Sequence, residues 1–339
     1  MKKYLVSILL LIALASPASS RIRNTIGGAV DTAPASRRCF TDTSWTFRED
    51  PSIDPPVTPN AWRSVVNGGG LFVATSISGT NKVMTSTEGI SWALRTSADE
   101  TLNWLAVTFG NNLFVAVADT NIVGTDKIMT SPDGITWTMQ NSAIDSGWRS
   151  ITFGNDLFVV IGTSVIGSGT VMTSPDGFNW TERTGFSGSW IDVTFGNNLF
   201  VAVSDANNNI MTSTNGINWT LRTAPSTSQW HSITFGDNLF VAVARNNITF
   251  NVMTSTDGIS WTGRNGASVS GWAAVAFGNG LYAATAFSGP DRIMTSTDAI
   301  TWTITPGGGV IKWFGLTFGD NKFVAVSESG ATNRIMTCP

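Results

Sequence analysis

The stretch WLAVTFGNNLFVAV, Trp104–Val117, and the stretch KIMTSPDGITWTMQ, Lys127–Gln140, decide the fold of this chain of 339 residues. Each holds two runs of apolar and β-branched residues, separated by Gly-Asn-Asn or Pro-Asp-Gly, which favour tight turns. The pattern predicts four β-strands, here called a to d, that pair in order as one antiparallel sheet: Trp104–Phe109, Leu113–Val117, Lys127–Ser131 and Ile135–Met139. Strand b is apolar on both faces, as expected for a sheet packed between two others.

This segment occurs seven times. Each copy opens on a tryptophan, and the openings are spaced 40 to 44 residues apart: Trp62, Trp104, Trp148, Trp190, Trp230, Trp272 and Trp313. A second tryptophan closes six copies, and Trp45 stands upstream of the first. A four-stranded repeat of this length is typical of a propeller blade. The sequence therefore predicts an all-β fold, a seven-bladed β-propeller of four-stranded antiparallel blades.

The two ends of the chain complete one blade. The seventh copy stops after strand c, and residues 44–48 have the pattern of strand d. We therefore expect an N-terminal strand to complete the last blade. Cys39 and Cys338 both occupy the repeat position that Ser131 has in the second copy, so we predict a disulfide between them.

The first residues have the pattern of a targeting segment. Lys2 and Lys3 precede an apolar run and then small residues, which indicates a secretory signal peptide over residues 1–20. We expect a linker over 21–38, a single propeller over 39–339, and a secreted or periplasmic protein without a lipid anchor or membrane insertion. A charged fraction of 13%, a net charge of −3 and no basic cluster argue against a nucleic-acid partner.

The c–d turns carry a recurring motif, Ser-x-Asp-Gly-x-x-Trp, complete at Ser131–Trp137, Ser174–Trp180 and Ser255–Trp261. In this motif the chain resembles the Asp-box, or bacterial neuraminidase repeat, family of sialidase-like β-propellers. We expect it to be a non-catalytic member of that family. The resemblance implies structural roles for three aspartates that lock the turn and three tryptophans that pack between blades: Asp133, Asp176, Asp257, Trp137, Trp180 and Trp261.

The residues that follow the opening tryptophan suggest a ligand site. Strand a is innermost in a propeller, so its first positions should approach the mouth of the central channel, on the face of the variable b–c and d–a loops. Only four of these positions carry ionisable side chains, namely Arg63, Arg149, Asp192 and His231. They are either ligand-binding residues or solvated side chains that line the channel. The opening tryptophans either stack on sugars or pack between blades.

Sialidase activity is not expected, because that family needs a central arginine triad and a nucleophilic tyrosine. Five arginines end strand d at the outer edge instead, and Tyr282 replaces a phenylalanine of strand b. We therefore assign no catalytic residue. A carboxylate pair of Asp192 with Asp99, Glu100, Asp145 or Asp205 stays open. One histidine and a predicted disulfide leave no expected metal site or cofactor.

The leading hypothesis is an exported, monomeric binding or scaffold propeller that recognises a glycan or protein partner on its variable face. One alternative is an Asp-box-type glycoside hydrolase that uses Asp192. Another is a protein-complex assembly factor of the kind found among photosystem-assembly propellers.

Overall fold

The computed structural model describes residues 45–52, 59–119, 127–163, 170–206, 209–246, 249–330 and 333–339. They all belong to the second of two compact units, Met1–Thr32 and Ala33–Pro339. Within these ranges the secondary structure consists of β-strands, with no helix. A search of the same ranges found no helix of the length and apolarity that a membrane span requires. The signal peptide predicted for residues 1–20 and the linker predicted for 21–38 lie outside the described residues.

The strands form seven four-stranded antiparallel sheets, each one blade. Blades 1 and 2 are β2 (Trp62–Gly68), β3 (Leu71–Ser76), β4 (Val83–Ser86), β5 (Ala93–Arg95), and β6 (Asn103–Gly110), β7 (Leu113–Asp119), β8 (Ile128–Ser131), β9 (Thr138–Gln140). Blades 3 and 4 are β10 (Gly147–Gly154), β11 (Leu157–Thr163), β12 (Val171–Ser174), β13 (Thr181–Arg183), and β14 (Trp190–Gly196), β15 (Leu199–Ser204), β16 (Asn209–Ser213), β17 (Thr220–Thr223). Blades 5 and 6 are β18 (Trp230–Gly236), β19 (Leu239–Ala244), β20 (Val252–Ser255), β21 (Thr262–Arg264), and β22 (Gly271–Gly278), β23 (Leu281–Ser288), β24 (Ile293–Ser296), β25 (Thr303–Ile304). Blade 7 is β26 (Trp313–Gly319), β27 (Lys322–Ser327), β28 (Ile335–Cys338) and β1 (Thr46–Arg48).

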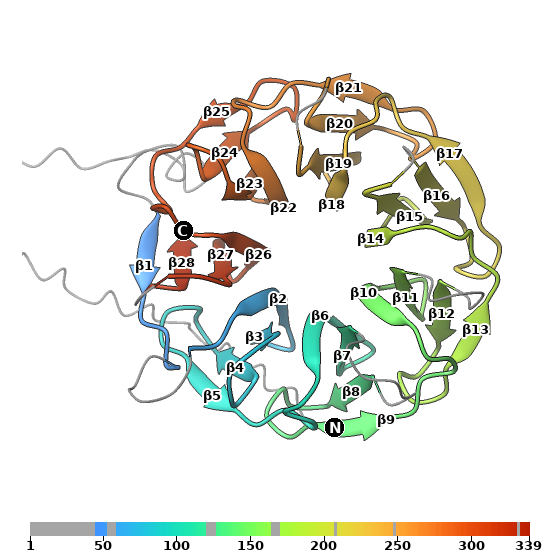
Figure 1. Cartoon of the computed structure of the whole chain (residues 1–339), viewed down its shortest axis with the longest axis vertical. Helices are drawn as coiled ribbons and strands as arrows, with labels where there is room; N and C mark the ends of the chain where they lie inside the picture. The colour runs from blue at the N-terminus through green and yellow to red at the C-terminus, as the bar shows by residue number, and fades with distance from the viewer. Residues whose placement is uncertain are drawn as a thin grey trace, which may run out of the picture. The chain divides into compact units, whose positions relative to one another are not determined.

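The blades are arranged in a closed ring (Figure 1). The first strand of each blade contacts the first strand of the next, from β2 through β6, β10, β14, β18 and β22 to β26, and β26 contacts β2 in turn. These seven strands are innermost, and the fourth strand of each blade lies at the outer edge of the ring. The predicted seven-bladed β-propeller is confirmed.

The last blade joins the two ends of the described chain. Strand β1 pairs antiparallel with β28, so that Thr46 faces Thr337 and Arg48 faces Ile335. This confirms that an N-terminal strand completes the last blade. Cys338 is fully buried at the end of β28. Because Cys39 lies outside the described residues, the Cys39–Cys338 disulfide remains a prediction.

Glycines at the end of strand a let successive blades approach each other. A Cβ on Gly196 would lie 2.0 Å from Cγ of Phe235 in the next blade, and the same relation joins Gly110 to Phe153 at 2.1 Å. The seven opening tryptophans are fully buried in the sheet interfaces. They therefore pack between blades, and no indole face is open to a sugar.

The c–d turns have the geometry that the motif suggested. Asp133 Oδ1 accepts hydrogen bonds from Ser131 Oγ at 2.9 Å and from the amides of Ile135 and Thr136 at 2.8 Å each. The indole Nε1 of Trp137 donates to the carbonyl of Gly134 at 3.1 Å. Strand d therefore starts later than predicted, at Thr138 rather than Ile135, because the aspartate holds these two amides in the turn.

The same turn recurs in the other complete motifs. Asp176 and Asp257 each accept a serine hydroxyl at 2.9 Å, and Trp180 and Trp261 each donate to the motif glycine at 3.0 Å. The hydrogen bond from the Ser260 amide is the largest of the contributions that lower the pKa of Asp257 to about 2. The structural roles of these aspartates and tryptophans remain a prediction.

Candidate functional site

A β-bulge interrupts the a–b ladder of every blade directly after the opening tryptophan. In blade 1, for example, Trp62 faces Ser76 while Ser64 already faces Thr75, so Arg63 is the extra residue. Bulges re-aim side chains at the edge of a sheet. We call the seven extra residues the bulge residues: Arg63, Leu105, Arg149, Ile191, His231, Ala273 and Phe314.

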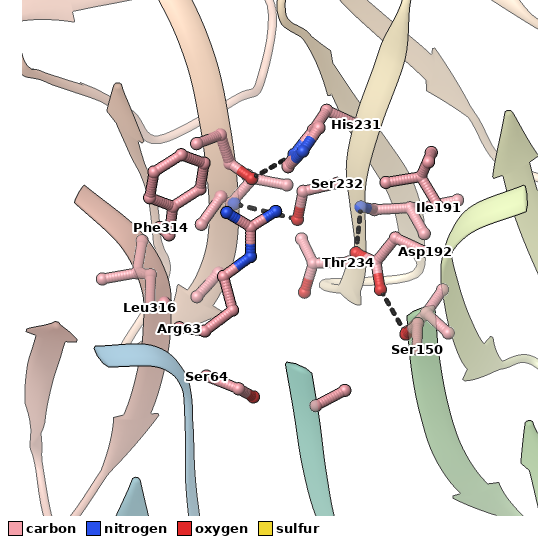
Figure 2. Close-up of a pocket in the computed structure, with 18 of the residues that line it drawn as sticks. Arg63, Ser64, Ser150, Ile191, Asp192, His231, Ser232, Thr234, Phe314 and Leu316 are labelled. Carbon is pink, nitrogen blue, oxygen red and sulfur yellow. Dashed lines mark hydrogen bonds between the residues drawn. The ribbon is translucent and has the colours of Figure 1, made fainter. Parts of the chain in front are cut away.

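All seven bulge residues line one cavity of about 510 Å³ in the central channel. The residue that follows each of them lines the same cavity, including Asp192 in blade 4. The structure therefore brings together Arg63, Arg149, Asp192 and His231, the four residues singled out in the sequence. Figure 2 shows Arg63, Asp192 and His231. Their binding of a ligand remains a prediction.

A second ring of side chains lies beside the bulge residues, at the end of strand b. These rim residues directly follow the residue that faces the opening tryptophan: Ile77, Asp119, Thr163, Asp205, Arg245, Phe287 and Glu328. In three cases a rim residue contacts the bulge residue of the next blade. Glu328 pairs with Arg63, and Asp119 Oδ2 lies 3.1 Å from Arg149 Nη1. The rings of Phe287 and Phe314 stack at 5.7 Å.

Arg245 departs from this complementary pattern. The bulge residue of the next blade is Ala273, which has no charge, and Arg245 forms no ion pair with any described residue. Its guanidinium lies over the ring of Phe287, with Cζ at 4.6 Å from the ring centroid. Arg63 lies in the same way over Phe314, at 3.9 Å. Since cation–π contact orients a guanidinium without neutralising it, Arg245 is a positioned cation at the mouth.

His231 is a neutral neighbour of these arginines. Its Nδ1 donates to the carbonyl of Ala273 at 2.8 Å, which assigns the proton to Nδ1 and leaves Nε2 as an acceptor. Burial, followed by the positive charge of Arg63, lowers the pKa of His231 to about 3. The histidine is therefore uncharged at neutral pH, and its Nε2 is a hydrogen-bond acceptor.

Asp192 connects blades through its carboxylate (Figure 2). Oδ1 accepts from Ser150 Oγ at 2.7 Å, and Oδ2 accepts from the amide of Ile233 in the next blade at 2.9 Å. Ser64 and Ser232 bind the next blade's amide in the same way, at 3.2 and 3.3 Å. Burial raises the pKa of Asp192, against these hydrogen bonds, which lower it. Asp192 therefore acts as a latch between blades, as the serines do.

The other acids proposed as partners of Asp192 are placed differently. Asp205 lines the same cavity, whereas Asp99, Glu100 and Asp145 do not. Asp99 caps the turn at Thr101, Glu100 accepts from the Ser97 amide at 2.7 Å, and Asp145 pairs with Lys127. Only Asp205 therefore remains as a partner for Asp192. Among the described residues, no group of three or more His, Cys, Asp or Glu side chains could hold a metal ion.

Sequence reasoning missed Arg245, which directly follows strand b of blade 5, and Phe287, which lies near the end of strand b in blade 6, because it considered strand a alone. The signal was present in the repeat alignment. Three rim residues carry a charge or a ring that complements the bulge residue of the next blade, but only the contacts across the blade interface show which residues meet.

Comparison with known proteins supports the fold class. The model of the DUF6242 beta propeller domain matches residues 131–265. No match was found among curated protein sequences. The structure is similar to that of a streptogramin B lyase, with 15% identity and a TM-score of 0.74 over 88% of this chain and 99% of that chain.

Two further solved structures have the same fold. YCF48 bound to D1 peptide has 14% identity and a TM-score of 0.65, over 91% of this chain and 99% of that chain. The GH74 enzyme of Niastella koreensis has 17% identity and a TM-score of 0.59, over 82% of this chain and 43% of that chain. The chain is thus a β-propeller, and its place in the Asp-box family remains a prediction.

Proposed function

We propose that this protein is a binding module that takes a carboxylate-bearing segment of a partner protein into the mouth of its channel. The observation that carries this proposal is Arg245, held over Phe287 and without an ion pair among the described residues. Two other arginines at the mouth, Arg63 and Arg149, have a carboxylate of their own. Arg245 therefore binds an acidic group of the partner protein.

His231 offers a second kind of contact: a hydrogen-bond acceptor, whereas Arg245 offers hydrogen-bond donors. Its Nε2 is a hydrogen-bond acceptor, since Nδ1 carries the proton, and burial together with the nearby arginines lowers the pKa and favours the neutral ring. A peptide offers both complements, since it has backbone N–H donors beside its acidic side chains. A guanidinium binds a carboxylate through two parallel hydrogen bonds, which are stronger than neutral ones.

A protein partner is favoured over a glycan because the phenylalanine rings at the mouth already pack against each other and against arginines. The opening tryptophans are fully buried, and Phe287 and Phe314 stack on each other beneath the two guanidiniums. Sugar stacking needs an open aromatic face. We further propose that the protein is exported, since residues 1–20 have the pattern of a signal peptide, and that it acts as a monomer.

Binding of labelled peptides tests the proposal. The probes are fluorescein-labelled decapeptides rich in Asp and Glu, each matched with a peptide that has Asn and Gln at the same positions. We expect the acidic peptides to bind, and to bind more weakly as salt rises. Arg245→Gln should weaken binding about 10-fold or more, as the loss of a charged hydrogen bond implies.

Two matched variants sharpen the test. Ala273→Asp places a carboxylate where Arg245 lacks one, so it should block binding although Arg245 is still present. Arg264→Gln removes an arginine of strand d, which bonds Thr254, and should leave binding unchanged. Equal affinity of the acidic and amide peptides, or of Arg245→Gln and wild type, would refute the proposal.

The alternatives give different results. Binding of oligogalacturonate but no acidic peptide, again lost in Arg245→Gln, would favour a glycan partner. Release of sugar from a polysaccharide, lost in Asp192→Asn, would favour the glycoside hydrolase.

A further inference from the structure

A polar side chain stands at the same place in each blade, directly before the Val-Met-Thr or Ile-Met-Thr run of strand c. In six blades the carbonyl of this residue accepts the same backbone hydrogen bond from the end of strand b, at 2.9 to 3.0 Å. These six side chains are also buried, and we call them the anchor residues: Lys82, Lys127, Thr170, Asn251, Arg292 and Arg334.

Five anchor residues bind the loop that leads into the next opening tryptophan. Lys82 Nζ donates to the carbonyl of Leu102 at 2.7 Å, and Lys127 pairs with Asp145. Thr170 Oγ1 donates to the carbonyl of Phe186 at 3.1 Å. Asn251 and Arg334 likewise donate to loop carbonyls, those of Ser268 and Asn60. The anchor residue therefore fastens the d–a loop of its blade.

Arg292 is the exception. It is only 9% exposed, and its Nε and Nη1 are buried without a hydrogen-bond partner. No described carboxylate lies within 4.0 Å of it. A buried cation without a partner is costly, by several kcal/mol in general.

The loop above Arg292 explains why it lacks a partner. Gly307, Gly308 and Gly309 follow one another with φ of +127°, +73° and +53°, which side chains rarely allow. The carbonyl of Gly308 accepts the indole Nε1 of Trp313 at 2.8 Å. A Cβ on Gly308 would lie 3.2 Å from Cβ of Arg292. The loop thus packs its backbone against the base of the Arg292 side chain, and residues 306–312 supply no acidic side chain.

We propose that Arg292, beneath the loop Gly307–Gly309, is a binding site for a small oxyanion, of the size and charge of a carboxylate. The anion takes the place that Asp145 has in blade 2, where it pairs with the anchor residue Lys127. The planar fork of a guanidinium matches two oxygens of such an anion. Burial lowers the pKa of Arg292 and no neighbouring charge opposes it, whereas Asp50 opposes the same effect at Arg334. This site is separate from the mouth and does not depend on the function proposed for it.

Thermal unfolding in matched salts tests the site, with sodium acetate as the probe and sodium chloride at equal ionic strength as the reference. We expect acetate to raise the Tm of the wild type by about 3 °C more than chloride does. Arg292→Gln should abolish that difference. Because it removes an unpartnered charge, it should also have a Tm in chloride at least as high as that of the wild type.

A second variant supplies the missing carboxylate within the chain. Asp145 stands three residues before Trp148, and the residue three before Trp313 is Val310, which is 92% exposed. Val310→Asp should therefore raise the Tm in chloride and remove the response to acetate. It carries the test alone if Arg292→Gln does not fold. Arg264→Gln, on the outer strand of another blade, should respond to acetate as the wild type does.

Two results would overturn the proposal. One is an equal response to acetate in the wild type and Arg292→Gln. The other is a Tm of Arg292→Gln in chloride that lies several degrees below the wild type, because the guanidinium would then have a partner within the chain.

Discussion

The glycine at the end of strand a should be among the least replaceable residues of this propeller, and Gly196→Ala tests this. A Cβ at that position would lie 2.0 Å from Cγ and 2.3 Å from Cδ1 of Phe235 in the next blade. Ordinary carbon–carbon contact needs about 3.5 to 4 Å. The ring of Phe235 cannot retreat freely, because it packs on Phe240 with ring centroids 4.6 Å apart.

The expected cost follows from these contacts. Adding a methyl to a packed core destabilises by about 1 to 3 kcal/mol, and the ring contact places Gly196→Ala at the upper end, about 3 kcal/mol. For a propeller of about 300 residues, whose entropy of unfolding is about 0.6 kcal/mol/K, that corresponds to a fall in Tm of about 5 °C. Differential scanning calorimetry measures it.

A matched glycine provides the control. Gly280 has φ of +73°, and a Cβ on it would meet no atom within 4 Å; Asn112 and Asn238 stand at the equivalent place with φ of 57° and 56°. Gly280→Asn should therefore change stability by less than about 0.5 kcal/mol. The double variant Gly196→Ala, Phe235→Leu should lose less stability than the two single changes summed, by about 1 kcal/mol or more. Additive effects would refute the reasoning.

Three further predictions concern titration and closure. Hydrogen bonds hold the pKa of Asp257 at about 2, below its ordinary 3.8, so the stability that its ionised form contributes is present above pH 4 and lost as pH falls towards 2. Acid unfolding curves should show that Asp257→Ala loses this contribution, while Asp257→Asn keeps the turn as Asn215 does in blade 4. His231, with a pKa of about 3, should bind a proton more readily in the unfolded chain, so stability should fall between pH 6.5 and 3, and His231→Gln should flatten that slope. Since the chain has one histidine, its NMR signal should show no titration step between pH 8 and 4; a step near 6.5 would contradict the buried, neutral ring. Intact mass with and without reductant should differ by two hydrogens if Cys39 and Cys338 are joined, and reduction should then lower stability by at most about 5 kcal/mol; two free thiols in the untreated protein would contradict the disulfide.

The blade pattern could be predicted from the sequence because it depends on local rules repeated seven times. Turn residues such as Gly110–Asn112 and the doubly apolar strand b define each sheet, and the half-copy at Trp45 shows how the ring closes. The start of strand d was predicted too early because apolar residues such as Ile135 lie in the turn. The hydrogen bonds of Asp133 there outweigh the β propensity of the residues around it.

The site was predictable in part. The two positions after each opening tryptophan indicated Arg63, Arg149, Asp192 and His231, all of which line the channel. The role of Asp192 as a latch could not be predicted, since it depends on the amide of Ile233 in the next blade. Arg245 lacks an ion pair among the described residues because its neighbour across the blade interface is Ala273. A single sequence does not show which rim residue contacts which bulge residue.

The most direct test of the account is the NMR signal of the Arg245 side chain, its ¹⁵Nε–Hε pair, in arginine-labelled protein, assigned by its loss in Arg245→Gln. Addition of an acidic decapeptide should shift this signal and leave that of Arg264 in place. A bound peptide that leaves the Arg245 signal unmoved would contradict the claim that the mouth of the channel binds a carboxylate there.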